Sequence, residues 1–317
     1  MKKYCIAILL CCLHIGAFTQ STEVKNYINE ITSIIKSNSL VAGQINWTEY
    51  EKDVSELSKN INSIDSCKPV LNYIIKTLRV NGDKHSFFIG KQGADAIING
   101  TALPEVAQGR LLNAHTGYIK VPSIVSFNEQ VNNRYRDTIQ QLIKKLDTEN
   151  EITAWIVDLR HNTGGSMWPM VAGLNALIKD GVAGYWVNTN NKSEKWYSYG
   201  RSFMGKGNFY KVKRMSSPIA VLIDSFTASS GEMTAISFIG LHNVKTFGQP
   251  SAGYITSNYP YRLSNGAIFA LAQAFAADRK KNIYKERIYP DVHIKENSKT
   301  ADDTMAAALE WVTKESS

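Results

Sequence analysis

The chain has 317 residues, of which 44% are hydrophobic and 20% are charged, and it contains 21 glycines, 8 prolines and 4 cysteines. This composition excludes an intrinsically disordered chain, a collagen-like repeat and a disulfide-dense scaffold. The formal net charge is +8 at pH 7, but the positive charges are spread thinly along the sequence. Because nucleic-acid binding needs a concentrated basic stripe, we expect no nucleic-acid partner.

Residues 1–20 have the pattern of an export signal. Two lysines precede a mostly apolar run at residues 4–15, and small or polar residues follow up to Gln20. This order is typical of a secretory signal peptide, and the apolar run is shorter than the ~20 residues that a membrane-spanning helix needs. We therefore expect cleavage near Gln20, an exported mature chain and no transmembrane segment within it.

Cleavage near Gln20 would remove three of the four cysteines and leave Cys67 alone. A single cysteine cannot form an internal disulfide, and in a helical stretch we expect Cys67 to be a small core residue. Lipidation of Cys11 or Cys12 is the alternative, although no Leu-Ala-Gly-type sequence precedes either residue. The mature protein is then expected in the periplasm or outside the cell, either free or lipid-anchored.

Residues 21–85 are predicted to form an N-terminal helical cap. Apolar residues recur at spacings of three and four over residues 24–35, as an amphipathic helix requires. Two further helices are predicted to end near Leu57 and Leu78. The turn sequence at residues 81–83 then ends the cap.

Residues 86–317 are predicted to form an α/β core. Strands are expected at residues 117–121, 153–159, 218–223 and 244–247, with helices at 127–146, at 170–178 and from the end of the third strand through 239. Strands that alternate with helices predict a layered α/β fold. Only about 30 residues separate Ser86 from Gly117, which leaves no room for an inserted peptide-binding domain of ordinary size.

A pair of glycines follows the strand at residues 153–159. From Asp158 to Gly165 the sequence reads Asp-Leu-Arg-His-Asn-Thr-Gly-Gly. Paired glycines let the backbone approach another group closely and leave N–H groups free to face a cleft. A plain strand-to-helix turn explains the pair equally well.

Small residues crowd a second turn, which runs from Asp224 to Glu232 as Asp-Ser-Phe-Thr-Ala-Ser-Ser-Gly-Glu. A strand ends here and a helix begins, so that a serine hydroxyl would lie beside the unpaired N–H groups of a helix start. Serine nucleophiles and their oxyanion holes are commonly built in this way. By position alone, however, Ser229 or Ser230 is more simply interpreted as a helix cap.

A nucleophilic serine needs a base, and five histidines follow residue 20: His85, His115, His161, His242 and His293. His85 differs from the others because a turn with Asp83 precedes it and an aromatic stretch that resembles a buried strand follows it. It therefore lies in the segment that joins the cap to the core, where a cleft would form. Because 144 residues separate His85 from Ser229, only the fold can bring them together.

Four motifs occur in an order that resembles the tail-specific, or C-terminal processing, serine peptidase family. They are Asp158-Leu159-Arg160-x-Asn162-x-Gly164-Gly165, Thr227-Ala228-Ser229-Ser230-Gly231-Glu232-Met233, Gly248-x-Pro250 and Pro290-Asp291. The resemblance covers residues 117–294, with His85-Ser86 upstream. The fold that it implies is a crotonase-like or ClpP-like α/β core.

The sequence departs from those family members that use a Ser–Lys dyad. Their lysine follows the Gly-x-Pro turn, at the position that Tyr254 occupies here. Tyrosine, with a pKa of ~10, is a poor base at neutral pH. The branch that includes the tricorn core and nisin-resistance-type peptidases uses a Ser–His pair, and Asp83-Lys84-His85-Ser86 resembles its histidine turn. The acid that positions the histidine in tricorn-type sites has its nearest counterpart in Glu286, which is displaced in sequence.

The resemblance implies a serine endopeptidase that cleaves peptide or protein substrates. Ser229 would be the nucleophile and His85 its base. The N–H groups of Ser230 and of Gly165, in preference to Gly164, would hold the oxyanion.

Met167 and Trp168 begin the helix after the glycine pair and are candidate substrate-binding residues, although core packing explains both equally well. No metal or other cofactor is expected, because the sequence has no His-Glu-x-x-His motif and no phosphate-binding loop. The main alternative is a catalytically inactive peptide-binding protein that keeps the peptidase fold, which Tyr254 favours. A crotonase-like acyl-transfer enzyme is a third option, for which no coenzyme A signature is present.

Overall fold

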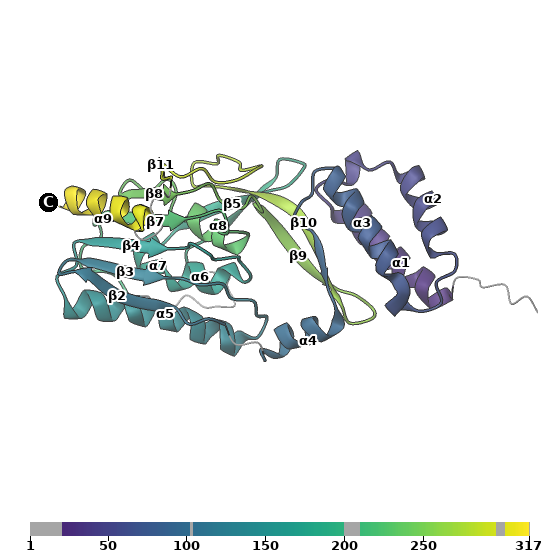
Figure 1. The fold of residues 1–317 in the computed structure, drawn as a ribbon, viewed down its shortest axis with the longest axis horizontal. Helices are drawn as coiled ribbons and strands as arrows, with labels where there is room; N and C mark the ends of the chain where they lie inside the picture. The colour runs from purple at the N-terminus through teal and green to yellow at the C-terminus, as the bar shows by residue number, and fades with distance from the viewer. Residues whose placement is uncertain (1–20, 102–103, 200–209, 296–301, 317) are drawn as a thin grey trace, which may run out of the picture.

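The computed structural model describes residues 21–101, 104–199, 210–295 and 302–316. Figure 1 shows an elongated molecule with the N-terminal helices at one end, an α/β core at the other end and a long β-hairpin between them. The export signal predicted for residues 1–20 lies outside the described residues. In the part of the chain that is described, no helix has both the length and the hydropathy needed to cross a membrane.

Three amphipathic helices form the N-terminal end, as the spacing of apolar residues predicts. They are α1 (Thr22–Asn38), α2 (Trp47–Ser58) and α3 (Lys68–Val80). The Ser21 hydroxyl caps α1 by accepting a hydrogen bond from the Val24 N–H at 3.2 Å, and the Asn46 side chain caps α2 in the same way. Cys67 is a free thiol that is fully buried among these helices, as expected for a small core residue.

The helices pack against one another and against one end of strand β10 (Ile268–Ala277). Phe269, Leu271 and Ala272 of this strand are buried in the same cluster as the apolar faces of α1 and α3. Near its other end, Ala276 belongs to the core cluster of the α/β part. One strand therefore contributes to the hydrophobic cores at both ends of the molecule.

β10 is the centre of an antiparallel sheet that was not predicted from the sequence. Its other members are β1 (Phe87–Ile89), β5 (Val182–Val187), β6 (Ser193–Tyr197) and β9 (Thr256–Arg262). β9 and β10 form the long hairpin of Figure 1, and their register shifts between Ala272 and Ala274. Helix α4 (Lys91–Asn99) is tied to this hairpin by the ion pair between Asp95 and Arg262 at 2.7 Å.

The second sheet is mostly parallel and confirms the predicted α/β fold class. Its order is β11 (Val292–His293), β8 (Val244–Gly248), β7 (Ile219–Ile223), β4 (Ala154–Asp158), β3 (Thr116–Lys120) and β2 (Gln108–Asn113), with β2 antiparallel to its neighbour. β4 and β7 are buried along their whole length, because helices cover both faces of the sheet. One face carries α5 (Glu129–Glu149), α6 (Met167–Gly173), α7 (Asn175–Ile178) and α8 (Ser230–Ile236), and the other carries α9 (Asp303–Ser316).

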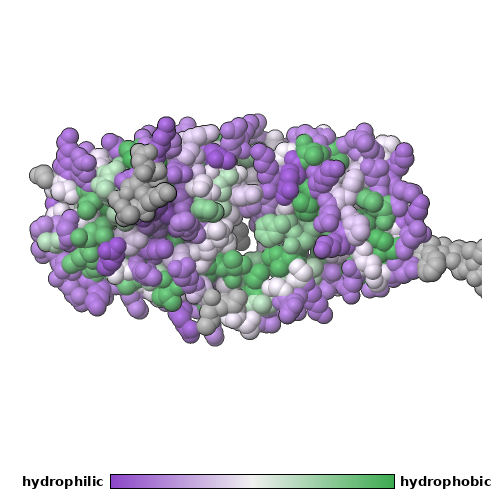
Figure 2. Space-filling view, in the orientation of Figure 1, coloured by the Kyte–Doolittle hydropathy of each residue, from purple (hydrophilic) through white to green (hydrophobic). Residues whose placement is uncertain are grey.

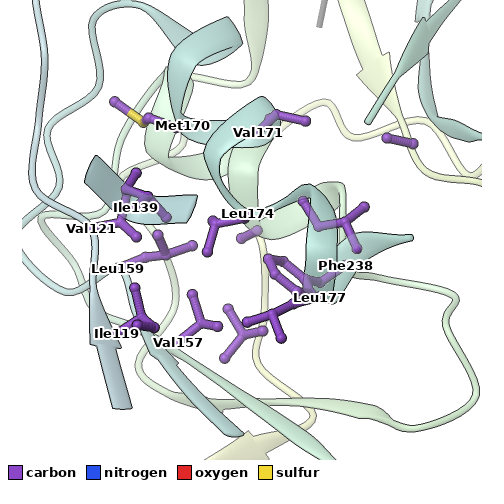
Figure 3. Packing of buried hydrophobic residues seen from close by; sticks show 14 of the residues in the cluster. Ile119, Val121, Ile139, Val157, Leu159, Met170, Val171, Leu174, Leu177 and Phe238 are labelled. Atoms are coloured by element: carbon purple, nitrogen blue, oxygen red, sulfur yellow. The ribbon is translucent and has the colours of Figure 1, made fainter. Parts of the chain in front are cut away.

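The larger hydrophobic cluster lies between this sheet and helices α5–α8. Figure 3 shows Ile119 and Val157 from the sheet beside Leu174, Leu177 and Phe238 from the helical layer. All five side chains are at least 98% buried. This packing fixes the sheet, and with it the ends of β4 and β7 from which the two motif-bearing turns leave.

Candidate active site

The two motif-bearing turns lie side by side because β4 and β7 are parallel neighbours. Both turns leave the carboxyl edge of the sheet, and hydrogen bonds join them directly. The Thr227 hydroxyl donates to the Leu159 carbonyl at 2.9 Å, and the Ala228 N–H donates to the Asn162 carbonyl at 2.9 Å. The topology therefore brings the glycine pair and the serine turn together at one place.

Ser229 has a strained backbone at the start of α8. Its φ angle is +51°, in a region that side-chain-bearing residues seldom adopt. The side chain of Glu232 supports this conformation, because its Oε2 atom accepts a hydrogen bond from the Ser229 N–H at 2.7 Å. Ser229 is half-buried and lines a cavity of about 600 Å³.

The Glu232 carboxylate also holds the loop that follows β8. It accepts hydrogen bonds from the Ser251 hydroxyl at 2.5 Å, from the Gly253 N–H at 2.8 Å and from the Tyr254 N–H at 2.9 Å. Burial raises the pKa of Glu232, and the four donors around it oppose that shift. One buried carboxylate thus fixes both the serine turn and the loop that carries Tyr254.

The glycine pair has a conformation and surroundings that exclude any larger residue. Gly164 and Gly165 have φ angles of +103° and +109°. A Cβ atom on Gly165 would lie 1.9 Å from the Ile124 carbonyl oxygen, and one on Gly164 would lie 2.7 Å from the Ser229 Cβ. The fully buried Asn162 side chain supports the turn, because its Oδ1 atom accepts a hydrogen bond from the Gly164 N–H at 2.9 Å.

The two predicted oxyanion donors, Gly165 and Ser230, line the same cavity as Ser229. They are also joined to each other, since the Ser230 hydroxyl donates to the Gly165 carbonyl at 2.6 Å. Within the described residues, neither the Gly165 N–H nor the Ser230 N–H has a hydrogen-bond acceptor. Two N–H groups without acceptors beside a cavity-lining serine are the arrangement that an oxyanion hole requires.

His85 lies in a tight turn between α3 and β1. The Asp83 carboxylate closes this turn by accepting hydrogen bonds from the His85 N–H at 2.9 Å and from the Ser86 N–H at 3.0 Å. The Ser86 hydroxyl in turn accepts a hydrogen bond from the Ala272 N–H at 2.9 Å. The histidine turn is therefore anchored to β10, the strand that joins the two ends of the molecule.

The His85 ring is buried, with 9% of the residue exposed, and its Nδ1 atom lies 2.8 Å from the Thr256 hydroxyl oxygen. Burial lowers the pKa of His85 from 6.5 to about 4. The imidazole is consequently neutral at pH 7, which is the form that can accept a proton. The rings of His85 and Tyr254 are neighbours, with centroids 5.4 Å apart.

His85 and Ser229 line two adjacent cavities that share Thr256. Ser229 lines the first, and His85 and Tyr254 line the second, which measures about 580 Å³. Among the described residues, no hydrogen bond joins the His85 ring to Ser229. Their connection runs instead through Tyr254, whose ring contacts His85 and whose N–H shares the Glu232 Oε2 atom with the Ser229 N–H.

The cavity beside Ser229 lies between the two ends of the molecule. Figure 2 shows the surface hollowed in this region, with hydrophobic side chains along part of the hollow. Its described lining includes aromatic residues from α6, β5 and β9, namely Trp168, Trp186 and Tyr259. Among those lining residues, only Glu129 is charged at neutral pH.

The structure separates the two candidate substrate-binding residues. Both Met167 and Trp168 border the cavity, but Met167 is only 6% exposed and belongs to the main hydrophobic cluster. Trp168 is half-buried at the edge of that cluster. Met167 is therefore mainly a packing residue, whereas Trp168 presents surface to whatever enters the cavity.

Three further polar residues belong to this site although sequence reasoning did not single them out. Glu232 was recognisable, because Ser229-x-x-Glu232 has the spacing of a capping box. Thr256 and Asn258 lie on β9 and reach His85 from 171 and 173 residues away, and no sequence pattern marks them. Glu286 lines the His85 cavity, but in the described structure the hydrogen-bond partner of the His85 ring is Thr256.

Comparison with known proteins agrees with this geometry. The model of peptidase family S41 matches residues 115–294. The nisin-resistance protein of Lactococcus lactis subsp. lactis is 31% identical over 271 residues, which cover 84% of this chain and 80% of that protein. The chloroplastic carboxyl-terminal-processing peptidase 2 of Arabidopsis thaliana is 25% identical over 176 residues, which are 55% of this chain and 31% of that protein.

Solved structures show the same fold. A lipoprotein from Streptococcus agalactiae superposes with a TM-score of 0.79 at 25% identity, over 92% of this chain and 96% of that one. The photosystem II D1 C-terminal processing protease superposes with a TM-score of 0.58 at 14% identity, over 93% of this chain and 97% of that one. The family match covers more than half of the chain and includes the Ser229 turn, the glycine pair and strands β3, β4, β7, β8 and β11 of the second sheet. The chain belongs to peptidase family S41.

Proposed function

We propose that this protein is an exported serine endopeptidase in which Ser229 is the nucleophile and His85 the general base. One observation carries the proposal: Ser229 lies beside two N–H groups that have no acceptor among the described residues, in a cavity that adjoins a buried, neutral histidine. A plain helix cap needs none of these neighbours. A residue in a strained backbone conformation at a cavity is also more typical of a reactive site than of a cap.

The reaction follows from these positions. Ser229 Oγ attacks the carbonyl carbon of a peptide bond while the unprotonated ring nitrogen of His85 takes the hydroxyl proton. The carbonyl oxygen becomes negatively charged and accepts hydrogen bonds from the Gly165 and Ser230 N–H groups. His85 then gives its proton to the departing amine. In the second half of the reaction, water attacks the acyl group on Ser229 while His85 takes a proton from it. His85 then returns this proton to Ser229 Oγ as the bond to the acyl group breaks. Each oxyanion donor contributes ~3 kcal/mol to transition-state stabilisation in well-studied cases.

The proposal includes a closing step. His85 and Ser229 line adjacent cavities and are not hydrogen-bonded to each other, and catalytic hydrogen bonds of this kind often tighten only when substrate binds. Thr256, shared by both cavities, lies where a bound peptide would pass. The bond between Ser229 Oγ and His85 is therefore expected to form in the peptide complex.

The cavity favours an internal stretch of peptide over a free carboxyl terminus. None of the described lining residues is Lys or Arg, so nothing in this lining would pair with a terminal carboxylate. Strand β9 borders the cavity, and β10 is its partner strand among the described residues. An extended peptide can add to the other edge of such a strand through backbone hydrogen bonds. The aromatic lining suits apolar side chains, and Glu129 favours a neutral or basic substrate.

The name of the Lactococcus relative suggests a substrate class. A protein named for resistance to nisin supports the proposal that antimicrobial peptides are substrates here, with proteins of the cell envelope as the second class. Both classes would meet this chain outside the cytoplasm, as the signal-like residues 1–20 predict. Export is tested by the mass of the mature N-terminus, which shows cleavage near Gln20, or a lipid on Cys11 or Cys12.

The proposed nucleophile is tested with a fluorophosphonate probe on residues 21–317, with mapping of the adduct by mass spectrometry. We expect labelling at Ser229 that is lost in Ser229→Ala and strongly reduced in His85→Ala. Ser225→Ala is the matched control, because Ser225 is an exposed serine of the same turn. Labelling that survives His85→Ala contradicts the assignment of the base. A protein that binds peptides without labelling or turnover supports the alternative of an inactive peptide-binding protein.

A further inference from the structure

We infer that Thr256 and Asn258 form a positioning relay that fixes the neutral His85 ring in the tautomer with its proton on Nδ1. This inference rests on the proposed function of His85 as a base. A neutral imidazole can carry its proton on either nitrogen, but only a ring nitrogen without a proton can accept one. The tautomer therefore decides whether the ring nitrogen that reaches Ser229 can accept the proton of its hydroxyl group.

Three hydrogen bonds form a closed ring around His85. The Asn258 Nδ2 atom donates to the His85 backbone carbonyl at 2.7 Å. The Thr256 hydroxyl donates to the Asn258 Oδ1 atom at 3.2 Å. The same Thr256 oxygen lies 2.8 Å from the His85 Nδ1 atom. Thr256 and Asn258 are two positions apart on β9, so their side chains lie on one face of the strand.

The His85 backbone carbonyl determines which atom is the donor in each of these three hydrogen bonds. A backbone carbonyl can only accept, so the amide group of Asn258 must turn its nitrogen towards His85 and its oxygen towards Thr256. That oxygen can only accept, so the single proton of the Thr256 hydroxyl is used in the bond to Asn258. The Thr256 oxygen has only lone pairs left for the His85 ring, and Nδ1 must supply the proton.

The result is an imidazole whose Nε2 atom has a free lone pair. In a Ser–His–Asp triad a buried carboxylate has this orienting role, and it also stabilises the imidazolium that forms during the reaction. Thr256 is neutral and provides only the orientation. This suits a ring that burial keeps neutral. With Thr256 in this role, the ring needs no hydrogen bond to Glu286, although Glu286 lines the same cavity.

The test observes the tautomer directly by long-range ¹H–¹⁵N correlation spectroscopy, on the protein as the cell exports it, labelled with ¹⁵N-histidine. At pH 7 we expect a pyrrole-type shift for the His85 Nδ1 atom and a pyridine-type shift for Nε2. A pyridine-type Nδ1 in the unmodified protein overturns the inference. Because the spectrum requires no turnover, it tests the relay separately from the reaction of Ser229 with a probe.

Substitutions then test each bond. Thr256→Ser keeps the hydroxyl, and we expect it to keep the spectrum and the rate of fluorophosphonate labelling. Thr256→Val keeps the shape without the hydroxyl, and we expect averaged nitrogen shifts and labelling slowed about 100-fold, the scale of a lost general base. Thr148→Val, an exposed threonine in α5, is the matched control.

Asn258→Ala gives the sharpest outcome, because it leaves Thr256 in place. Without Asn258 the Thr256 hydroxyl is free to donate to Nδ1, so both tautomers become available and the shifts should average. A melting curve for each variant establishes that it is folded. Nitrogen shifts that stay as in the unmodified protein in both folded Thr256→Val and Asn258→Ala overturn the relay. Averaged shifts in both, with unchanged shifts in Thr256→Ser, support it.

Discussion

The Oε2 atom of Glu232 lies 2.7 Å from the backbone nitrogen of Ser229, and this contact joins the serine turn to the loop at Tyr254. The carboxylate is fully buried and accepts four hydrogen bonds, all from N–H or O–H donors. A side chain that itself carries N–H donors, such as glutamine, would leave some of these groups without an acceptor. The positive φ angle of Ser229 therefore depends on the acid three residues later in the chain.

We expect Glu232→Gln to lower the free energy of unfolding by about 3 kcal/mol, because its amide group would face buried donors and leave one or two without acceptors. Fluorophosphonate labelling of Ser229 should fall with it. Chemical denaturation measures the first effect and probe kinetics the second. Glu149→Gln, an exposed carboxylate at the end of α5, should change neither. Equal effects in the two variants would contradict this role of Glu232.

A methyl group on Gly164 should disable the site. It would lie 2.7 Å from the Ser229 Cβ and 3.0 Å from the Ser230 nitrogen, at a φ angle that L-residues rarely adopt. We expect Gly164→Ala to abolish labelling of Ser229, because the serine and the Ser230 N–H, a proposed oxyanion donor, must both shift. Gly43→Ala is the control, since its methyl group would meet nothing within 4 Å. Probe labelling of the two folded variants gives the comparison.

Met167 and Trp168 should respond differently to truncation. Met167→Ala removes a buried core side chain and should cost about 2–5 kcal/mol of unfolding free energy. Trp168→Ala removes surface from the cavity and should mainly raise the KM for peptide cleavage. Denaturant unfolding and steady-state kinetics on one peptide substrate distinguish the two effects. A larger loss of stability in Trp168→Ala than in Met167→Ala would reverse the assignment.

Stability should depend on pH through His85. Burial lowers its pKa from 6.5 to about 4, so between these values the unfolded chain binds more protons than the folded one. The contribution of the neutral ring is complete above about pH 6.5 and is lost as the pH falls towards 4, with a total of about 3 kcal/mol. The unfolding free energy of the unmodified protein, minus that of His85→Gln, should rise with pH across this window. A flat difference would contradict the pKa shift.

Hydrophobic pattern and turn chemistry predicted strands β3, β4, β7 and β8 and the layered α/β fold class, but not the order of the strands. The runs that became β4 and β7 are buried on both faces because helices cover both sides of the sheet. The helix predicted to begin at Met167 and to run to residue 178 is two helices, α6 and α7. The antiparallel sheet was not foreseen. β10 reads as an alanine-rich apolar run and β9 as polar and interrupted by Pro260, so neither has a strand-like alternation.

The candidate site also contains residues that the sequence predicted and residues that it did not. Ser229 and the glycine pair are adjacent in space because two neighbouring strands end there, and their motifs were visible in the sequence. Thr256 and Asn258 contact His85 through pairings formed by the fold. Their side chains gain a role only when β9 passes the histidine turn, and a lone Thr-x-Asn spacing carries no such information.

The two halves of the chemistry belong to different parts of the architecture. The parallel sheet holds Ser229 and the proposed oxyanion donors, whereas the β9–β10 hairpin holds Thr256 and, through Ala272, the turn of His85. The register shift of this hairpin falls between Ala272 and Ala274, and such bulges bend a strand. The distance between the proposed base, His85, and the proposed nucleophile, Ser229, therefore depends on the curvature of β10. A straighter β10 would change that distance without altering any of the described residues that line the cavity beside Ser229.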